Sequence, residues 1–262
     1  MGLGAMFGIR FPMNFNSPYQ SRNIIEFWRR WHMSLSAFLK QYLYIPLGGN
    51  RKGPQRRYVN MMITMVIGGM WHGAGTTFLV WGFWHGLLLC LNHGWQAISS
   101  HLGLKEPGRI GRASSWLLTL VAVMIGWVFF RADSMDSAFR ILSVMGGGNG
   151  IVLADSYQRY LGPLASALQG WGVTFQARES FVFLAGAPQL AFMGAALAVA
   201  ALAPNSQSIV GFRHDFCAFA DDRPSPSFSW RPNLAYATGV ATILIWTVLS
   251  LSEKSEFIYF NF

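Results

Sequence analysis

The sequence has 262 residues, of which 52% are hydrophobic, 15% aromatic and only 12% charged, and its formal net charge is +9. An average soluble domain carries about 25% charged residues, so this composition excludes an ordinary soluble enzyme, a disordered chain and a collagen-like fibre. Two cysteines, Cys90 and Cys217, are too few for a disulfide scaffold or a cysteine-based zinc site. We therefore expect an integral membrane protein.

The first 57 residues hold almost all of the net charge. They contain nine basic side chains and one acidic side chain, a balance of +8, whereas the remaining 205 residues contribute +1. A basic segment beside a membrane helix faces the cytoplasm under the positive-inside rule, so we expect segment 22–57 on the cytoplasmic side. Nucleic-acid binding is the competing interpretation, but the aromatic residues interleaved with these basic ones favour an anionic lipid surface.

Residues 23–43 have the pattern of an amphipathic helix that lies along the membrane surface. Asn23 with Glu26 three positions later forms a start that resembles a capping box. Apolar side chains then recur at spacings of three and four, which predicts one helix in the plane of the interface. Turn chemistry at Pro46 and at residues 48–50 ends the segment.

Four stretches without any charged residue follow, and the first runs for 47 residues between Arg57 and Lys105. About 20 apolar residues span the hydrocarbon core as a helix. The stretches predict membrane spans at 58–71, 76–93, 115–131, 183–203 and 233–251. The first two are short, so we expect a tilted, buried or re-entrant element there. Segments 146–180 and 213–232 are expected to be loops.

Two histidines, His72 and His85, lie inside the longest uncharged stretch. An ionisable side chain in a membrane span is costly and marks a functional candidate, and imidazole suits proton transfer near neutral pH. A histidine that only holds helices together by a hydrogen bond is the alternative interpretation of each. His32 in the interfacial segment either reaches inward or anchors at the headgroups.

Other kinds of site have no support in the sequence. The Gly-x-Ser-x-Gly elbow of serine hydrolases and the Walker-type phosphate loop do not occur, and neither cysteine has a basic neighbour to activate it. No metal site is predicted, because there is no His-x-x-x-His pair and no acidic residue near His72 or His85.

Short motifs follow one another in a recognisable order. They are Phe15-Asn16-Ser17-Pro18-Tyr19, Glu26-Phe27-Trp28-Arg29-Arg30-Trp31-His32-Met33-Ser34-Leu35-Ser36, Tyr42-Leu43-Tyr44-Ile45-Pro46-Leu47-Gly48-Gly49-Asn50-Arg51, Trp71-His72-Gly73-Ala74, Trp81-Gly82, His85-Gly86 and Gly126-Trp127-Val128-Phe129-Phe130-Arg131-Ala132. In this order the sequence resembles the membrane-bound O-acyltransferase superfamily, specifically its bacterial alginate O-acetyltransferase-like branch. The resemblance is dense over 11–86, good to 132 and loose beyond.

The resemblance implies an all-α fold in a single membrane domain over 1–262. We therefore expect a polytopic helical membrane protein that has an interfacial amphipathic helix and short or re-entrant helices around a buried histidine site. By the resemblance His72 matches the catalytic histidine and His32 matches a second functional polar position. We expect His72 to act as general base and His32 to polarise the acyl carbonyl or orient the acceptor. The candidates for substrate binding are His85, Trp71, Arg29, Arg30 and Arg51. These arginines and Arg57 could attract a phosphate-rich donor, and binding of anionic lipid is the alternative role of each.

The implied reaction moves an acetyl group from a thioester donor, such as acetyl-CoA, to a hydroxyl, with no bound cofactor. The branch resemblance further implies a bacterial inner membrane protein that passes acetyl groups to a periplasmic polysaccharide O-acetyltransferase partner acting on alginate or a similar exopolysaccharide. Members of the family run to roughly twice this length, so we expect the chain to be the C-terminal part of such a fold, with N-terminal helices missing.

Two other classes of protein stay open. A transporter would also place histidines inside a helix bundle, and it predicts substrate flux that persists when both histidines are replaced. An inactive or assembly-only fragment would fit the short length, and it predicts no acyl transfer from the chain by itself.

Overall fold

The computed structural model describes residues 2–9, 11–105, 107–148, 150–177, 187–210 and 233–250. These fall into two compact units. The larger unit is Ser17–Leu202, and the smaller combines Met1–Asn16 with Ala203–Phe262. The single membrane domain over 1–262 stays a prediction. The predicted loop 213–232 and the end of the chain lie outside the described residues.

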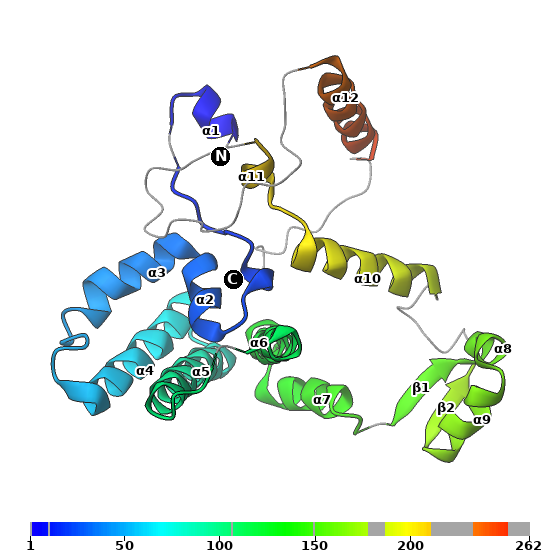
Figure 1. Cartoon of the computed structure of the whole chain (residues 1–262), viewed down its shortest axis with the longest axis horizontal. Helices are drawn as coiled ribbons and strands as arrows, with labels where there is room; N and C mark the ends of the chain where they lie inside the picture. The colour runs from blue at the N-terminus through cyan, green and yellow to red at the C-terminus, as the bar shows by residue number, and fades with distance from the viewer. Residues whose placement is uncertain are drawn as a thin grey trace. The chain divides into compact units, whose positions relative to one another are not determined.

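The larger unit is mainly helical (Figure 1). Its elements are η1 (Pro18–Gln20), α2 (Ile24–Arg30), α3 (Met33–Leu39), η2 (Lys40–Tyr44), α4 (Gly53–His72), α5 (Thr76–His101), α6 (Arg109–Arg131), α7 (Met135–Met145), β1 (Ile151–Ala154), η3 (Asp155–Tyr157), α8 (Gln158–Leu161), α9 (Pro163–Gly170), β2 (Val173–Gln176) and α10 (Ala187–Leu202). The described helices of the smaller unit are α1 (Gly2–Met6), α11 (Ser206–Val210) and α12 (Leu234–Leu249).

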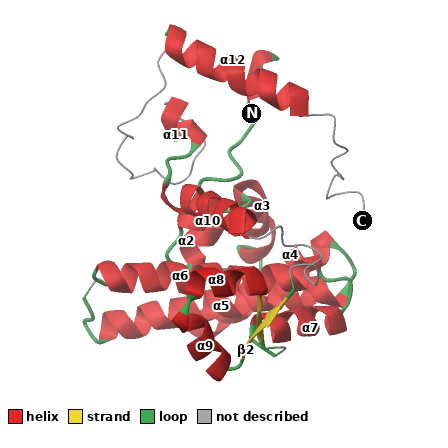
Figure 2. Ribbon diagram, turned by 90° about the vertical axis from the view of Figure 1, so that its right-hand side faces the viewer, coloured by secondary structure: helices red, strands yellow, loops and turns green. Residues whose placement is uncertain are grey.

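Helices α4, α5 and α6 form the centre of the larger unit, with α5 packed against both of the others and against α2 (Figures 1 and 2). The contact between α4 and α5 depends on glycine. A Cβ at Gly82 would lie 2.5 Å from the carbonyl oxygen of Met65, and a Cβ at Gly69 would lie 2.3 Å from that of Phe78. Small residues of this kind let two helix backbones approach closely. The close approach fixes the two helices that carry His72 and His85.

The prediction that 58–71 and 76–93 are short elements is wrong. Helix α4 has 20 residues and α5 has 26, which correspond to about 30 and 39 Å at 1.5 Å per residue. Helix α4 extends beyond the uncharged stretch, whereas α5 lies wholly within it. Helix α4 begins earlier, in the basic segment, with proline in its first turn, where proline is well tolerated. Helix α5 continues beyond residue 93 through a more polar end.

Among the described helices, Arg109–Arg131 has the length and hydropathy to cross a membrane, with a mean hydropathy of 2.0. It contains the predicted span 115–131. Two shorter apolar helices, Leu190–Leu202 and Leu234–Leu249, lie within the predicted spans 183–203 and 233–251. The placement of these helices in a bilayer stays a prediction.

The interfacial segment 23–43 is not one helix. Its start is as predicted, because the Asn23 side chain accepts a hydrogen bond from the Glu26 backbone N–H at 2.8 Å. The helix then breaks after Arg30: Trp31 is extended, and His32 has φ 42° and ψ 55°, in the left-handed region. Helix α3 and the π-helical turn η2 follow. The spacing of apolar residues continues across the break, so periodicity could not show it.

The segment predicted as the loop 146–180 contains regular structure, although the described chain is mainly helical, in agreement with the all-α prediction. Strands β1 and β2 pair in parallel, with Ile151 opposite Val173 and Ala154 opposite Gln176. The helices α8 and α9 make the connection that a parallel pair requires. Each strand has only four residues, and such short runs between glycines are easily taken for loop.

Candidate active site

The three candidate histidines of the larger unit lie in one aromatic cluster. His72 ends helix α4, and its ring centroid is 4.8 Å from that of Trp71, 4.9 Å from that of Phe130 and 5.3 Å from that of Trp81. Helices α4, α5 and α6 therefore all contribute a ring to the surroundings of His72. Its side chain is only partly buried, so one side of the imidazole remains accessible.

The break between α2 and α3 places His32 beside the same cluster. The His32 ring lies 6.2 Å from Trp71, edge to face, so Trp71 contacts both His32 and His72. The two imidazoles are close enough for a charge on one to act on the other. Burial lowers the pKa of His32 below its ordinary value of 6.5, so the neutral form is favoured at neutral pH. A neutral imidazole can donate one hydrogen bond and accept another.

His85 is the most deeply placed of the three, with 1% of its surface exposed. Its Nδ1 accepts a hydrogen bond from the indole Nε1 of Trp28 at 3.3 Å, which assigns the proton to Nε2 in the neutral ring. Gly126 on α6 leaves room for this ring, because a Cβ there would lie 2.7 Å from Nε2. These contacts favour a role in positioning the cluster. The substrate-binding role predicted for His85 stays a prediction.

Trp81 and Trp28 complete the cluster, and sequence analysis gave neither a role. Trp81 is 5% exposed, and its ring lies 4.9 Å from His85 and 5.9 Å from Trp28. Its position on α5 between His72 and His85 follows from the fold. The only signal in the sequence was its place in the Trp81-Gly82 motif.

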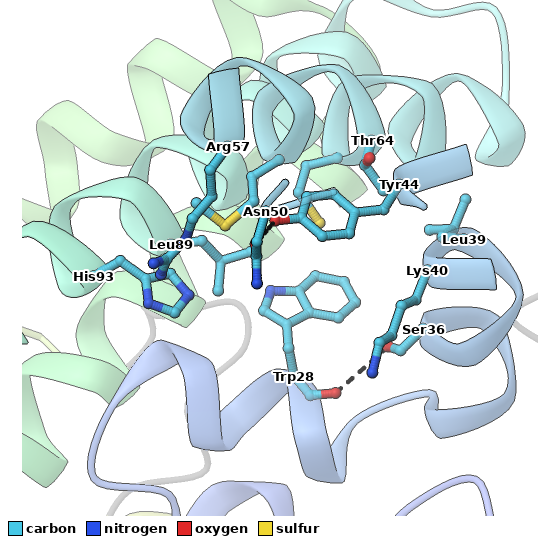
Figure 3. Close-up of a pocket in the computed structure, with 12 residues that line it drawn as sticks. Trp28, Ser36, Leu39, Lys40, Tyr44, Asn50, Arg57, Thr64, Leu89 and His93 are labelled. Atoms are coloured by element: carbon cyan, nitrogen blue, oxygen red, sulfur yellow. Dashed lines mark hydrogen bonds between the residues drawn. The ribbon is translucent and has the colours of Figure 1, made fainter. Parts of the chain in front are cut away.

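A cavity of about 280 Å³ opens on the other side of Trp28 (Figure 3). In Figure 3 the Trp28 indole lies in the middle of the pocket, with Lys40 on one side and Arg57 and His93 on the other. The lining combines an apolar floor with a polar rim and has no acidic residue. Its residues are Trp28, Ser36, Leu39, Lys40, Tyr44, Asn50, Arg57, Met61, Thr64, Met65, Leu89 and His93.

The rim is held by polar contacts between neighbouring elements. The Tyr44 hydroxyl donates a hydrogen bond to the Asn50 side chain, and the Ser36 hydroxyl donates to the Trp28 carbonyl at 3.4 Å. Trp28 thus belongs to the pocket and to the histidine cluster at once, since its indole N–H bonds His85. The pocket and the cluster share this one wall.

The three arginines predicted to bind the donor do not line this pocket. Arg29 is exposed on α2, and Arg30 forms an ion pair with Glu26 at 3.0 Å. Arg51 is exposed in the turn before α4. The pocket instead contains Arg57, the fourth arginine expected to attract the donor, and Lys40, for which the sequence predicted no role. The grouping of these two residues depends on the fold. No cluster of three or more metal-binding side chains occurs within the described ranges.

Comparison with known proteins adds an independent finding. A probable alginate O-acetylase AlgI of Azotobacter vinelandii is 38% identical over 271 residues, covering 100% of this chain and 50% of its own length. A probable AlgI of Pseudomonas aeruginosa is 48% identical over 145 residues, covering 55% of this chain and 26% of its own length. A peptidoglycan O-acetyltransferase of Helicobacter pylori is 46% identical over 153 residues, covering 58% and 28% respectively.

The chain thus spans half the length of the Azotobacter relative, and its matches cover about a quarter of the other two. Residues 1–132 match the family described as MBOAT, membrane-bound O-acyltransferase family. This range contains His32, His72 and His85, together with the aromatic rings around them. Because the family match covers half of the sequence, the chain belongs to the membrane-bound O-acyltransferase family.

Proposed function

We propose that this chain carries the reaction site of a membrane-bound O-acetyltransferase that acts on a polysaccharide hydroxyl. The observation that carries the proposal is the position of two histidines that are 40 residues apart in the sequence on the same Trp71 ring, at 4.8 and 6.2 Å. Two imidazoles beside each other, one partly accessible, can take a proton and stabilise charge at one reacting centre.

In the proposed reaction the hydroxyl oxygen of the acceptor attacks the thioester carbonyl carbon, and His72 takes the hydroxyl proton as the new C–O bond forms. The carbonyl oxygen gains negative charge, which His32 stabilises by donating a hydrogen bond from its neutral ring. The C–S bond then breaks, and His72 returns the proton to the departing sulfur. The products are an ester and a free thiol, so atoms and charge balance. A general base of this kind contributes about 10²–10⁴-fold to the rate.

The pocket beside Trp28 is the proposed binding place of the thioester donor. Its rim offers Lys40 and Arg57 to an anionic group such as the phosphates of acetyl-CoA, and its apolar floor suits the less polar arm of the donor. Trp28 lines this pocket and also contacts the histidine cluster through its hydrogen bond to His85. Arg29, Arg30 and Arg51 are proposed to attract the donor to this side of the protein from a distance.

The acceptor follows from the relatives. They are named alginate O-acetylase and peptidoglycan O-acetyltransferase, so the polymer that finally carries the acetyl group is proposed to be a bacterial exopolysaccharide such as alginate. The polymer is reached through a periplasmic acetyltransferase partner. The protein is proposed to cross the bacterial inner membrane several times, with segment 22–57 on the cytoplasmic side.

Replacing single histidines at the native locus tests the proposal. We expect His72→Gln to abolish polymer acetylation and His32→Gln to reduce it strongly, with unchanged amounts of protein in the membrane. His101→Gln is the matched control, because His101 is exposed at the end of α5, and it should leave acetylation unchanged. Normal acetylation in the His72→Gln variant would contradict the proposed function. Flux of an unacetylated substrate that persists in both variants would instead support a transporter.

A further inference from the structure

The indole N–H of Trp81 is a buried donor with no hydrogen-bond acceptor in the described part of the chain. Its side chain is 5% exposed, and the nitrogen is shielded from water. Buried polar groups in folded proteins are nearly always paired, so an unpaired one calls for an explanation. Either the fold tolerates the loss of stability that an unpaired buried donor causes, or the donor forms its hydrogen bond with a ligand.

Among the described residues, no side chain or backbone group next to Trp81 accepts a hydrogen bond from its indole N–H. Within the described part of the chain its ring contacts those of Trp28, His72, His85 and Phe130, at centroid distances of 4.9–5.9 Å. The Nδ1 of His85 already accepts from Trp28. An all-carbon ring would therefore fill the same space without an unpaired donor, as Phe130 does on the facing helix.

The position of Trp81 is also fixed more firmly than a gap-filling side chain requires. The next residue, Gly82, lets α5 approach the backbone of α4 closely. A Cβ added at Gly82 would lie 2.5 Å from the Met65 carbonyl oxygen and 2.9 Å from the Val66 Cα. Helix α5 cannot rotate there without breaking this contact. The indole is thus held at a set distance from His72, which is the property of a preorganised donor.

We propose that Trp81 donates its indole N–H to the carbonyl oxygen of the acyl group that reacts beside His72. This inference rests on the proposed function. No bond to Trp81 forms or breaks: the hydrogen bond strengthens as the carbonyl oxygen becomes negative and weakens again when the C–S bond breaks. Trp81 and His32 would then be two donors to the same oxygen, arriving from α5 and from the break between α2 and α3.

A substitution that removes only the N–H tests the proposal. Incorporation of benzothienylalanine at position 81 keeps the shape of the indole and replaces the N–H by sulfur, and Trp81→Phe is the genetically simple companion. The matched control is Trp95→Phe on the same helix, where the side chain is 60% exposed. The kcat for acetyl transfer from acetyl-CoA should fall about 10²- to 10³-fold in both position-81 variants. The KM for acetyl-CoA and the thermal midpoint of the benzothienyl variant should change little.

A binding measurement by NMR distinguishes a hydrogen bond to the ligand from a role of Trp81 in packing alone. The indole ¹H–¹⁵N resonance of Trp81, assigned by its loss in Trp81→Phe, should shift downfield with a ketone analogue of acetyl-CoA that carries carbon in place of the reactive sulfur. S-ethyl-CoA, which lacks the carbonyl oxygen, should not produce this shift. A normal kcat in the benzothienyl variant, or equal shifts with both analogues, overturns the role of Trp81. Failure of the wild-type protein to transfer acetyl, or a normal rate in His72→Gln, contradicts the proposed function itself.

Discussion

The contact between α4 and α5 at Gly82 should not tolerate one added methyl group. In Gly82→Ala the new Cβ would lie 2.5 Å from the Met65 carbonyl oxygen and 2.9 Å from the Val66 Cα, and both are backbone atoms that cannot swing aside. The helices must therefore separate by about 0.5–1 Å, which forfeits a quarter to a half of the dispersion attraction across the contact.

The size of the effect follows from two opposing contributions. Overpacking of a well-packed contact costs about 1–3 kcal/mol, while replacing glycine by alanine inside a helix returns about 0.5–1 kcal/mol. We expect Gly82→Ala to destabilise the protein by about 1–2 kcal/mol in total. Because Trp81 is the neighbouring residue, the same change should also lower acetyl transfer.

Thermal unfolding in detergent or nanodiscs, followed by the helical circular dichroism signal, measures this effect. The matched control is Gly94→Ala on the same helix, where no atom lies within 4 Å of the added Cβ. That variant should be as stable as the wild type or slightly more stable, by about 0.5–1 kcal/mol. Equal midpoints for Gly82→Ala and Gly94→Ala would refute the argument that backbone contact at Gly82 sets the helix spacing.

Further expectations concern His32 and the pocket rim. His32→Val should lower the free energy of unfolding by about 1–2 kcal/mol more than His32→Asn does, because asparagine tolerates the left-handed backbone at φ 42° and a β-branched residue does not. Burial lowers the pKa of His32 in the folded protein, so the unfolded chain binds more protons and stability should fall as the pH drops below 6.5; His32→Asn should flatten this dependence. Lys40→Gln and Arg57→Gln should each raise the KM for acetyl-CoA about tenfold at constant kcat, since each removes a charge-assisted contact. Arg140→Gln, at an exposed position on α7 outside the pocket, should not. Unchanged KM values in both pocket variants would contradict the proposed donor site.

The sequence predicts the helices at the centre of the fold because their signals are local. Long uncharged stretches mark α4, α5 and α6, and the cap at Asn23 marks the start of α2. The break at His32 has no such signal, since the apolar spacing continues through it and histidine is not a residue type that marks a left-handed backbone position as glycine does. Strands β1 and β2 are four residues each and are stabilised by pairing with each other across a connection.

The residues of the candidate site likewise fall into those with a local sequence signal and those that only the fold brings together. His72 and His32 could be chosen from motifs, because each motif is continuous in the sequence. The roles of Trp28 and Trp81 depend on contacts between helices that are far apart in the chain, at ring distances such as 4.9 Å between Trp81 and His85. The pocket residues Lys40 and Arg57 likewise come together only when α4 folds back beside η2.

The central claim is that His72 takes the proton of the acceptor hydroxyl. The most direct test is the pH dependence of the single-turnover rate of acetyl transfer from acetyl-CoA in the wild-type protein and in His72→Gln. The wild-type rate should reach a plateau as the imidazole loses its proton. The rate of the variant should be about 10²–10⁴-fold lower and should keep rising with hydroxide concentration. A variant rate within a few-fold of the wild type, with the same plateau, would contradict this role of His72.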